Sequence, residues 1–143
     1  MVSVEKAART RRYQSGTSIV EMAIVLPLLL MLVFGIGEFG VAFTRWNSLT
    51  NAVREGARMG VVFRSPCVQG AVETEIETTI ADFADSSGLN GAGIATTIVG
   101  ACGGTGTQLS VTGSAPYTYI ALSALGGWAP TTDLEARTVM RNE

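Results

Sequence analysis

Residues 16–38 read GTSIVEMAIVLPLLLMLVFGIGE, a long apolar run that carries an acid, Glu21, near its start. No charged residue occurs from Met22 to Gly37, and about 20 such residues cross the hydrocarbon core of a bilayer as a helix. An ionised carboxylate inside a span costs at least ~2.5 kcal/mol by insertion scales. The run therefore predicts a transmembrane helix in which Glu21 has a special role.

The residues before this run are basic. Four of the 10 Lys and Arg residues and one of the 12 acids precede Gly16, so this segment has a formal charge of +3 and the chain from Thr17 onward has −5. Positive charge on the short N-terminal side predicts a cytoplasmic N-terminus and an exported C-terminal part. Because no basic patch remains in the exported part, we expect no nucleic-acid partner.

A cleaved secretory signal peptide is the alternative for this N-terminus. The apolar segment of such a peptide is ~7 to 15 residues long and ends at a small-residue cleavage site. Here the apolar run is longer and continues directly into a helical pattern. The sequence thus favours an anchor that stays on the mature protein.

An amphipathic pattern follows the apolar run. Its apolar residues recur every three or four positions, as on one face of a helix: Phe39, Phe43, Trp46, Leu49, Val53, Ala57 and Gly60. We predict one helix over residues 17–63, roughly 70 Å long at ~1.5 Å per residue, with the membrane span at about 19–40 and an extramembrane stalk at 41–63. Pro27 is expected to bend the span. Ala52, Gly56 and Gly60 would permit close approach of the segment that covers the stripe.

Residues 64–143 are expected to form an extracytoplasmic α+β head. A helix is predicted from about Gly70 to Ser86, with acids on its solvated faces. Short β-prone runs separated by Gly, Pro and Ser predict an antiparallel sheet of three or four strands: Ile94–Val99, Gln108–Thr112, Tyr117–Leu122 and Leu134–Met140. Trp128, in the loop Gly126–Pro130, is either an interaction point or a buried anchor. The fold class is α+β, with a long N-terminal transmembrane and stalk helix, a second helix and a small sheet.

The two cysteines, Cys67 and Cys102, both lie in the part predicted to be exported. A disulfide is the natural interpretation in an oxidising compartment, and two unpaired core residues are the alternative. The chain has no His, so neither cysteine has a histidine with which to share a zinc site, and we expect no metal and no cofactor.

The sequence contains no recognisable combination of catalytic residues, and we do not expect an enzyme. The acids of the second predicted helix lack the looped spacing of calcium ligands. The glycines from Gly35 to Gly40 match G-x-G-x-x-G, but the strand, tight turn and helix of a βαβ unit are missing around them. An extracytoplasmic enzyme that uses the acids of the second helix therefore has no support.

Gly16, the basic segment before it and Glu21 together resemble the leader of type IV prepilins. The similarity continues through four downstream motifs: Leu26–Leu30, Gly37–Gly40, Leu49–Ala52 and Arg54–Arg58. The whole string resembles the TadE/TadG-like family, the minor pilins or pseudopilins of the tight-adherence (Flp, type IVc) pilus machinery. Thr17 stands where many pilins have Phe, and Met22 where Flp major pilins have Tyr, which argues against the major subunit.

This resemblance implies a type IV pilin-like fold and a cut by prepilin peptidase between Gly16 and Thr17. Residues 1–16 would be the leader, and Glu21 would neutralise the amine of Thr17 in a neighbouring subunit during assembly. Such pairing relieves two charges that are expensive when left separate in hydrocarbon. The resemblance also implies helix-packing and motif roles for seven further residues: Pro27, Gly37, Glu38, Arg54, Glu55, Gly56 and Arg58.

The implied partners are other pilin and minor pilin subunits, prepilin peptidase, the inner-membrane pilus assembly platform and the lipid bilayer. The implied role is pilus initiation or a place at the tip, in adhesion and surface attachment, with the protein in the inner membrane before assembly. The main alternative is a static single-span membrane scaffold with a periplasmic binding head. Glu55 and Arg58 can form either a solvated ion pair on the stalk or, as the resemblance favours, a contact with another subunit or the head.

Overall fold

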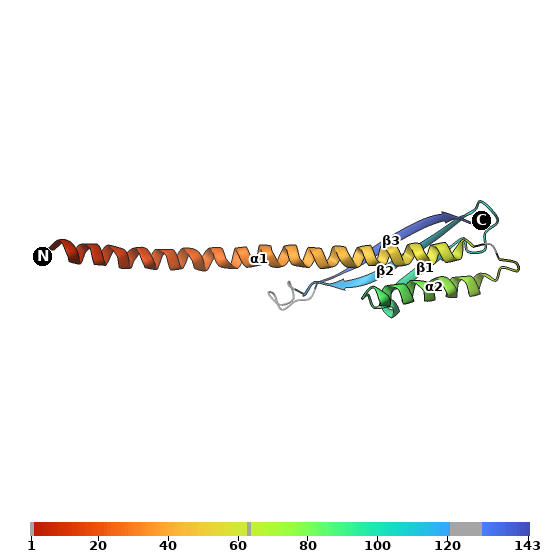
Figure 1. Cartoon of the computed structure of the whole chain (residues 1–143), viewed down its shortest axis with the longest axis horizontal. Coiled ribbons are helices and arrows are strands. Elements are labelled where there is room, and N and C mark those ends of the chain that lie inside the picture. The colour runs from red at the N-terminus through yellow and green to blue at the C-terminus, as the bar shows by residue number, and fades with distance from the viewer. Residues whose placement is uncertain (1, 63, 121–129) are drawn as a thin grey trace. The chain divides into compact units, whose positions relative to one another are not determined.

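A computed structural model describes residues 2–62, 64–120 and 130–143, and the side chains of residues 16–62, 64–91, 93–120 and 130–143 (Figure 1). The described residues form two helices, a short 3₁₀ helix and three strands. In chain order they are α1 (Val2–Gly60), α2 (Gln69–Ser86), η1 (Gly91–Gly93), β1 (Ala95–Val99), β2 (Gln108–Thr118) and β3 (Thr131–Arg141). By their internal contacts, residues Met1–Phe39 and Gly40–Glu143 form two separate compact units. The predicted α+β class, with a long apolar helix, a second helix and a small antiparallel sheet, is confirmed.

Helix α1 is longer than the sequence predicted at its N-terminal end. It begins at Val2, so its backbone is helical through the basic segment, and it ends at Gly60. Pro27 lies inside the helix without ending it. The second helix matches its predicted range within one residue, because the apolar positions from Val72 to Ala84 repeat every four residues.

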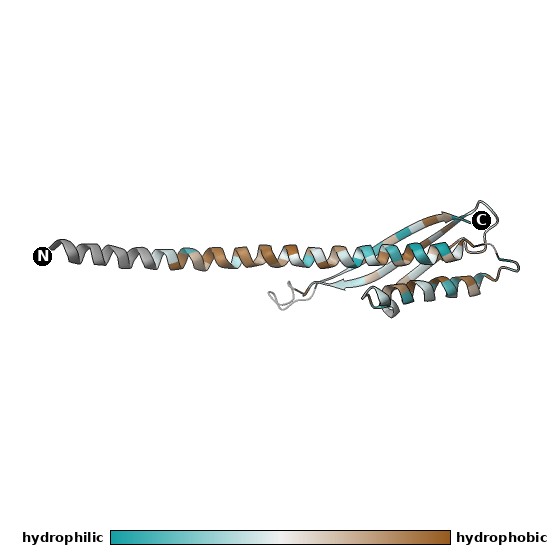
Figure 2. Ribbon diagram, in the orientation of Figure 1, coloured by the Kyte–Doolittle hydropathy of each residue, from teal (hydrophilic) through white to brown (hydrophobic). Residues whose placement is uncertain are grey.

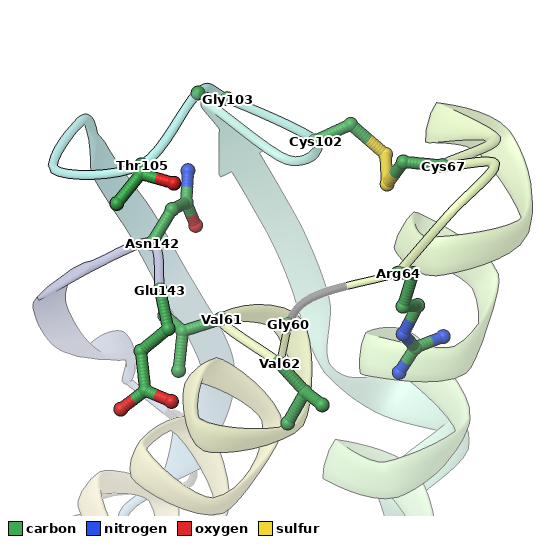
Figure 3. A pocket seen from close by; sticks show the side chains of 11 residues that line it. Gly60, Val61, Val62, Arg64, Cys67, Cys102, Gly103, Thr105, Asn142 and Glu143 are labelled. Atoms are coloured by element: carbon green, nitrogen blue, oxygen red, sulfur yellow. A yellow bond between two sulfur atoms is a disulfide. The ribbon is translucent and has the colours of Figure 1, made fainter.

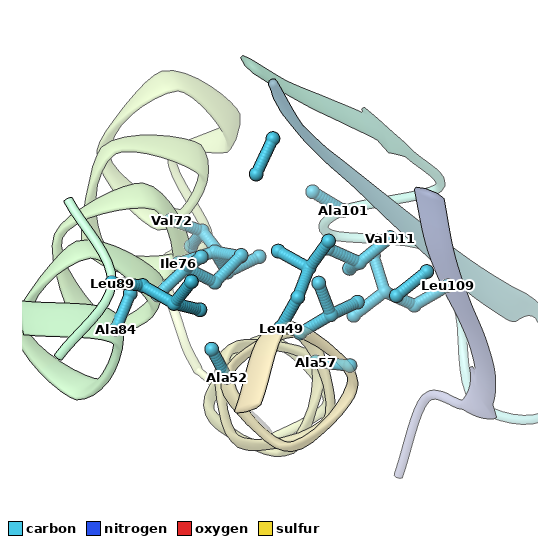
Figure 4. Close-up of a cluster of buried hydrophobic side chains, with 14 residues drawn as sticks. Leu49, Ala52, Ala57, Val72, Ile76, Ala84, Leu89, Ala101, Leu109 and Val111 are labelled. Carbon is cyan, nitrogen blue, oxygen red and sulfur yellow. The ribbon is translucent and has the colours of Figure 1, made fainter. Parts of the chain in front are cut away.

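The core of the second unit lies where α1, α2 and the sheet meet (Figure 4). Helix α1 contributes small and branched side chains, α2 contributes a row of aliphatic ones, and β2 contributes alternate residues. The fully buried members with large side chains are Leu49, Val53, Ile76, Ile80, Leu109, Val111 and Tyr117. Each such aliphatic side chain contributes about 1.5–3 kcal/mol through the surface it removes from water. The C-terminal half of the predicted stripe is thus covered by the head.

The N-terminal half of that stripe is much more exposed than its C-terminal half. Phe39 is 72% exposed, Phe43 50% and Trp46 42%. Phe43 and Trp46 contact each other, with ring centroids 6.0 Å apart. Trp46 also donates a hydrogen bond from Nε1 to the carbonyl of Glu135 in β3, at 3.1 Å. The stripe therefore changes from exposed to buried between Trp46 and Leu49.

The sheet has the order β1-β2-β3 and is antiparallel throughout. Its central strand, β2, is a single strand from Gln108 to Thr118, whereas the sequence predicted a break before Tyr117. Gly113 belongs inside the strand because a Cβ there would lie 2.6 Å from Cγ2 of Val53 on α1. Pro116 lies beyond the residues that pair with β1, where β2 has a free edge that tolerates a missing N–H. The last residues of the predicted Tyr117–Leu122 strand, and Trp128, lie outside the described residues.

A disulfide joins Cys67, in the connection between α1 and α2, to Cys102, in the connection between β1 and β2. The two Cα atoms are 5.7 Å apart, and the bond closes a loop with a sequence separation of 35. Asn142 holds the same end of the head by a second means. Its Nδ2 donates to the carbonyl of Gly100 at 3.0 Å and to Oγ1 of Thr107 at 2.9 Å. The chain end and both connections are thereby fixed to one another.

Candidate functional site

The apolar part of α1 buries none of its side chains among the described residues. The helix from Gly16 to Gly60 contains a window of mean hydropathy 2.7 in which none of the residues is buried, so it is long and apolar enough to cross a membrane. Figure 2 shows this as a hydrophobic stretch followed by a part of α1 with mixed hydropathy. Exposure of so many large apolar side chains is stable in lipid and unfavourable in water. One N-terminal apolar helix of this kind fits a single-pass membrane protein.

Gly16, Thr17 and Glu21, the residues expected to act in processing and assembly, lie on this helix, and all three are exposed. The helix places Glu21 one turn after Thr17. Four-residue spacing puts the two on the same face of α1. A neighbouring chain therefore has access to both positions from one side of the helix.

The glycines of α1 fall into two classes. Gly35, Gly37 and Gly40 have nothing within 4 Å of the position where a Cβ would stand. A Cβ on Gly56 would lie 2.5 Å from Cγ1 of Ile80, and one on Gly60 would lie 2.6 Å from both Ile76 and Leu109. Gly35, Gly37 and Gly40 thus leave room for an external neighbour to approach the helix. Gly56 and Gly60 allow α2 to approach α1 closely, as the four-residue spacing of these glycines predicted.

The residues of the motif Arg54–Arg58 lie on two faces of α1, one buried and one exposed. Gly56 and Ala57 are buried, whereas Arg54 and Arg58 are exposed and Glu55 is half-buried. Among the residues with described side chains, the only ion pair within 4.0 Å joins Arg64 to Glu75. Glu55 and Arg58 therefore do not form the ion pair that their three-residue spacing permits, and both arginines face away from the core.

Arg64 fastens the end of α1 to α2. Its guanidinium donates to the carboxylate of Glu75 and, through Nη2, to the carbonyl of Met59 at 3.2 Å. The hydrogen bond from Arg64 is the main reason that the pKa of Glu75 lies below its usual range, and the same bond raises the pKa of Arg64. Both side chains are partly exposed, so the pair is a modest clamp.

A shallow pocket of about 240 Å³ lies beside this clamp, near the disulfide (Figure 3). Its lining includes Val62, Arg64, Asn142 and Glu143 together with the Gly103–Thr105 turn. Arg64 is held by Glu75, and Asn142 is held by Gly100 and Thr107. The polar groups of the lining are thus used for structure. No group of three or more His, Cys, Asp or Glu that could hold a metal ion occurs among the described residues.

The arrangement defines a class of protein: an α+β domain carried on the end of a long helix whose N-terminal part fits a membrane span. Residues 16–58 match the family described as TadE-like protein. This match confirms the resemblance to the TadE/TadG-like family over those residues, and it connects the chain with the tight-adherence pilus machinery and its components. No curated protein and no solved structure matches the chain.

Two contacts that position the head against α1 were missed by the sequence analysis. Trp46 was assigned only to the apolar stripe, and its hydrogen bond reaches a residue 89 positions away. Helical spacing places Arg45 off the apolar stripe, yet its guanidinium carbon lies 5.4 Å from the centre of the buried Tyr117 ring. A cation over an aromatic face is favourable. Neither contact has a local sequence signal, because each depends on where β2 and β3 cross α1.

Proposed function

We propose that this chain is a minor pilin, or pseudopilin, of a tight-adherence (Flp) pilus. It is processed by prepilin peptidase after Gly16 and acts in pilus initiation or at the tip, in adhesion and surface attachment. The observation that carries the proposal is the family match, which begins at Gly16 and includes both Glu21 and the Arg54–Arg58 motif. The leader before Gly16 is basic, as a segment retained in the cytoplasm should be.

In this proposal the chain waits in the inner membrane, with its N-terminus in the cytoplasm and its head in the periplasm. Cleavage removes the basic segment and exposes an amine at Thr17. The carboxylate of Glu21 then pairs with the Thr17 amine of a neighbouring pilin or minor pilin subunit at the assembly platform. Pairing between molecules removes two costly isolated charges from hydrocarbon at once, so subunits that enter in register are favoured.

The proposed role is structural and not enzymatic. It needs no cofactor, because the energy of association comes from helix packing and from the charge pair. The exposed glycines Gly35, Gly37 and Gly40 support this, since small residues allow the backbones of neighbouring membrane helices to approach closely.

Replacing Glu21 with Gln tests the assembly step. The substitution keeps the size of the side chain and removes the charge, so an assembling subunit should disappear from sheared pili, or fail to support their formation, while its level in the membrane is unchanged. The exposed acid Glu77 on α2 provides a control, because Glu77→Gln removes an equal charge far from the amine. Normal piliation with Glu21→Gln would instead favour a static membrane scaffold.

A further inference from the structure

The exposed face of the stalk part of α1 is a polar stripe. We call it the arginine stripe; it consists of Asn47, Asn51, Arg54 and Arg58. All four side chains are exposed, and their spacing of four, three and four residues puts them on one face of the helix. Leu49, Val53 and Gly56, which contact α2 or the sheet, lie on the opposite face. The head to which this helix belongs therefore leaves the arginine stripe uncovered.

No described side chain balances the charge of this stripe through an ion pair. Arg54 and Arg58 form no ion pair with any described side chain, since the only ion pair there belongs to Arg64. The half-buried Glu55 sits between them in sequence, yet it does not pair with Arg58. Two cations thus stand one helical turn apart on a face that points out of the molecule.

Helix α2 presents the complementary surface. Its sequence contains five acids and no basic residue. One exposed face, which we call the acidic stripe, consists of Thr74, Thr78, Asp82 and Asp85 at a spacing of four, four and three. Asp85 is oriented by the amide of Gly91, which donates to its Oδ1 at 2.7 Å. Among the described residues, Asp82 takes part in no ion pair, and the two stripes are equally long.

We propose that the arginine stripe of one copy of this chain docks on the acidic stripe of a second copy. This inference rests on the proposed function, in which pilin and minor pilin subunits assemble side by side. Because the two surfaces differ, the contact is head-to-tail, and each added copy leaves one stripe of each kind open. Such a contact repeats along a fibre and does not close into a dimer.

The internal register of the head relates each ion pair between two copies to a displacement of one copy along α1. Gly56 lies against Ile80 and Gly60 against Ile76, so α2 runs antiparallel to α1 and Asp82 is level with Arg54 of its own chain. Between parallel copies, Arg58 meets Asp82 of the second copy if that copy is displaced along α1 by four residues. At ~1.5 Å per residue this is a displacement of about 6 Å.

The two stripes carry opposite charge on the same chain, so a second copy supplies the partner surface that each stripe needs. This complementarity favours a second copy over an unrelated acidic protein as the occupant of the arginine stripe.

A charge-exchange experiment tests the contact. Two full-length copies with different tags are produced together in membranes, and co-purification is measured for Arg58→Glu and Asp82→Arg. Either variant present in both copies should lower recovery about threefold or more, since each contact then opposes like charges. Combining Arg58→Glu in one copy with Asp82→Arg in the other restores attraction at every contact and should restore recovery. Glu77→Arg in both copies is the matched control, because it makes the same charge change outside the acidic stripe.

Rescue by the combined variants, together with weaker association at high salt, supports the contact. Equal recovery for all combinations, or loss without rescue, overturns it. The proposed function fails separately, if Gly16 is not cut or if Glu21→Gln leaves piliation intact. A chain that is processed and needs Glu21, yet shows no charge exchange, would disprove only the stripe contact.

Discussion

From Ile19 to Ile36, helix α1 exposes large apolar side chains in all directions and buries none of them, whereas from Leu49 to Gly60 the same helix buries one face and exposes the other. Both regions are regular helix, so the backbone does not distinguish them. The two regions differ in what covers their apolar side chains. In the second region, the chain's own α2 and sheet cover the apolar face. In the first region, the apolar side chains need a solvent or a partner that the chain does not supply. Substitutions in the head should therefore change its own stability, and those in the span should change association.

The largest expected effect on the head comes from removing the disulfide. Cys67→Ser together with Cys102→Ser opens a loop with a sequence separation of 35, which costs about 3–4 kcal/mol in the chain-entropy model. Hydrogen exchange of the β2 amides, measured in detergent by mass spectrometry, should show much faster opening. Helicity of the apolar span should be unaffected. Unchanged protection of β2 would mean that Asn142 and the core hold the head without the bond.

Ile76→Ala should destabilise the head by about 3 kcal/mol, because Ile76 is fully buried between α1 and the sheet and the substitution leaves a cavity. The control is Val99→Ala, which removes a side chain that is 62% exposed and should change stability by less than about 0.5 kcal/mol. Denaturant titration, monitored by hydrogen exchange of the β2 amides, compares the free energy of unfolding of the two variants. Similar losses for both variants would contradict the assignment of the core.

Gly56→Leu and Gly37→Leu make the same change in the two regions of α1. At Gly56 the new side chain meets Ile80, so we expect a loss of about 1–3 kcal/mol in head stability. At Gly37 nothing lies within 4 Å, so head stability should be unchanged while association of full-length copies in membranes weakens. If Gly37→Leu destabilised the head, the two regions would not be independent.

Glu75→Gln should have the smallest effect. The pKa of Glu75 is lowered in the folded protein, so its stabilising contribution is present above the unfolded pKa of about 4.5 and is lost as the pH falls through the lower folded value. The melting temperature of the wild type should exceed that of Glu75→Gln slightly near pH 7, and the difference should vanish at acidic pH. A difference that grows on acidification would contradict the sign of the shift.

Periodic features were accessible from the sequence, and contacts between distant residues were not. The stalk stripe and the helix from Val72 to Ala84 were predicted because their signal repeats every three to four residues. Strand β2 was divided because Gly113 and Pro116 are normally breaks, and only the close approach of Val53 and the free edge explain their place inside a strand.

The candidate site residues likewise divide into those that the sequence pattern reveals and those that it does not. Glu21 stands out because an acid in an apolar run is unusual, and the spacing of Gly56 and Gly60 predicts close packing. Asn142 shows no local signal, because its side-chain partners are 42 and 35 residues away. Helical spacing places Arg54 and Arg58 off the apolar stripe, whereas no spacing predicts the contacts of Arg45 and Trp46 with β2 and β3.

The central claim is that Thr17 becomes the N-terminus and supplies the amine that Glu21 needs. Mass spectrometry of the intact protein, purified from cells with and without prepilin peptidase, tests it most directly. The account predicts a chain that begins at Thr17 when the peptidase is present and at Met1 when it is absent. A chain that begins at Met1 in both strains would contradict it.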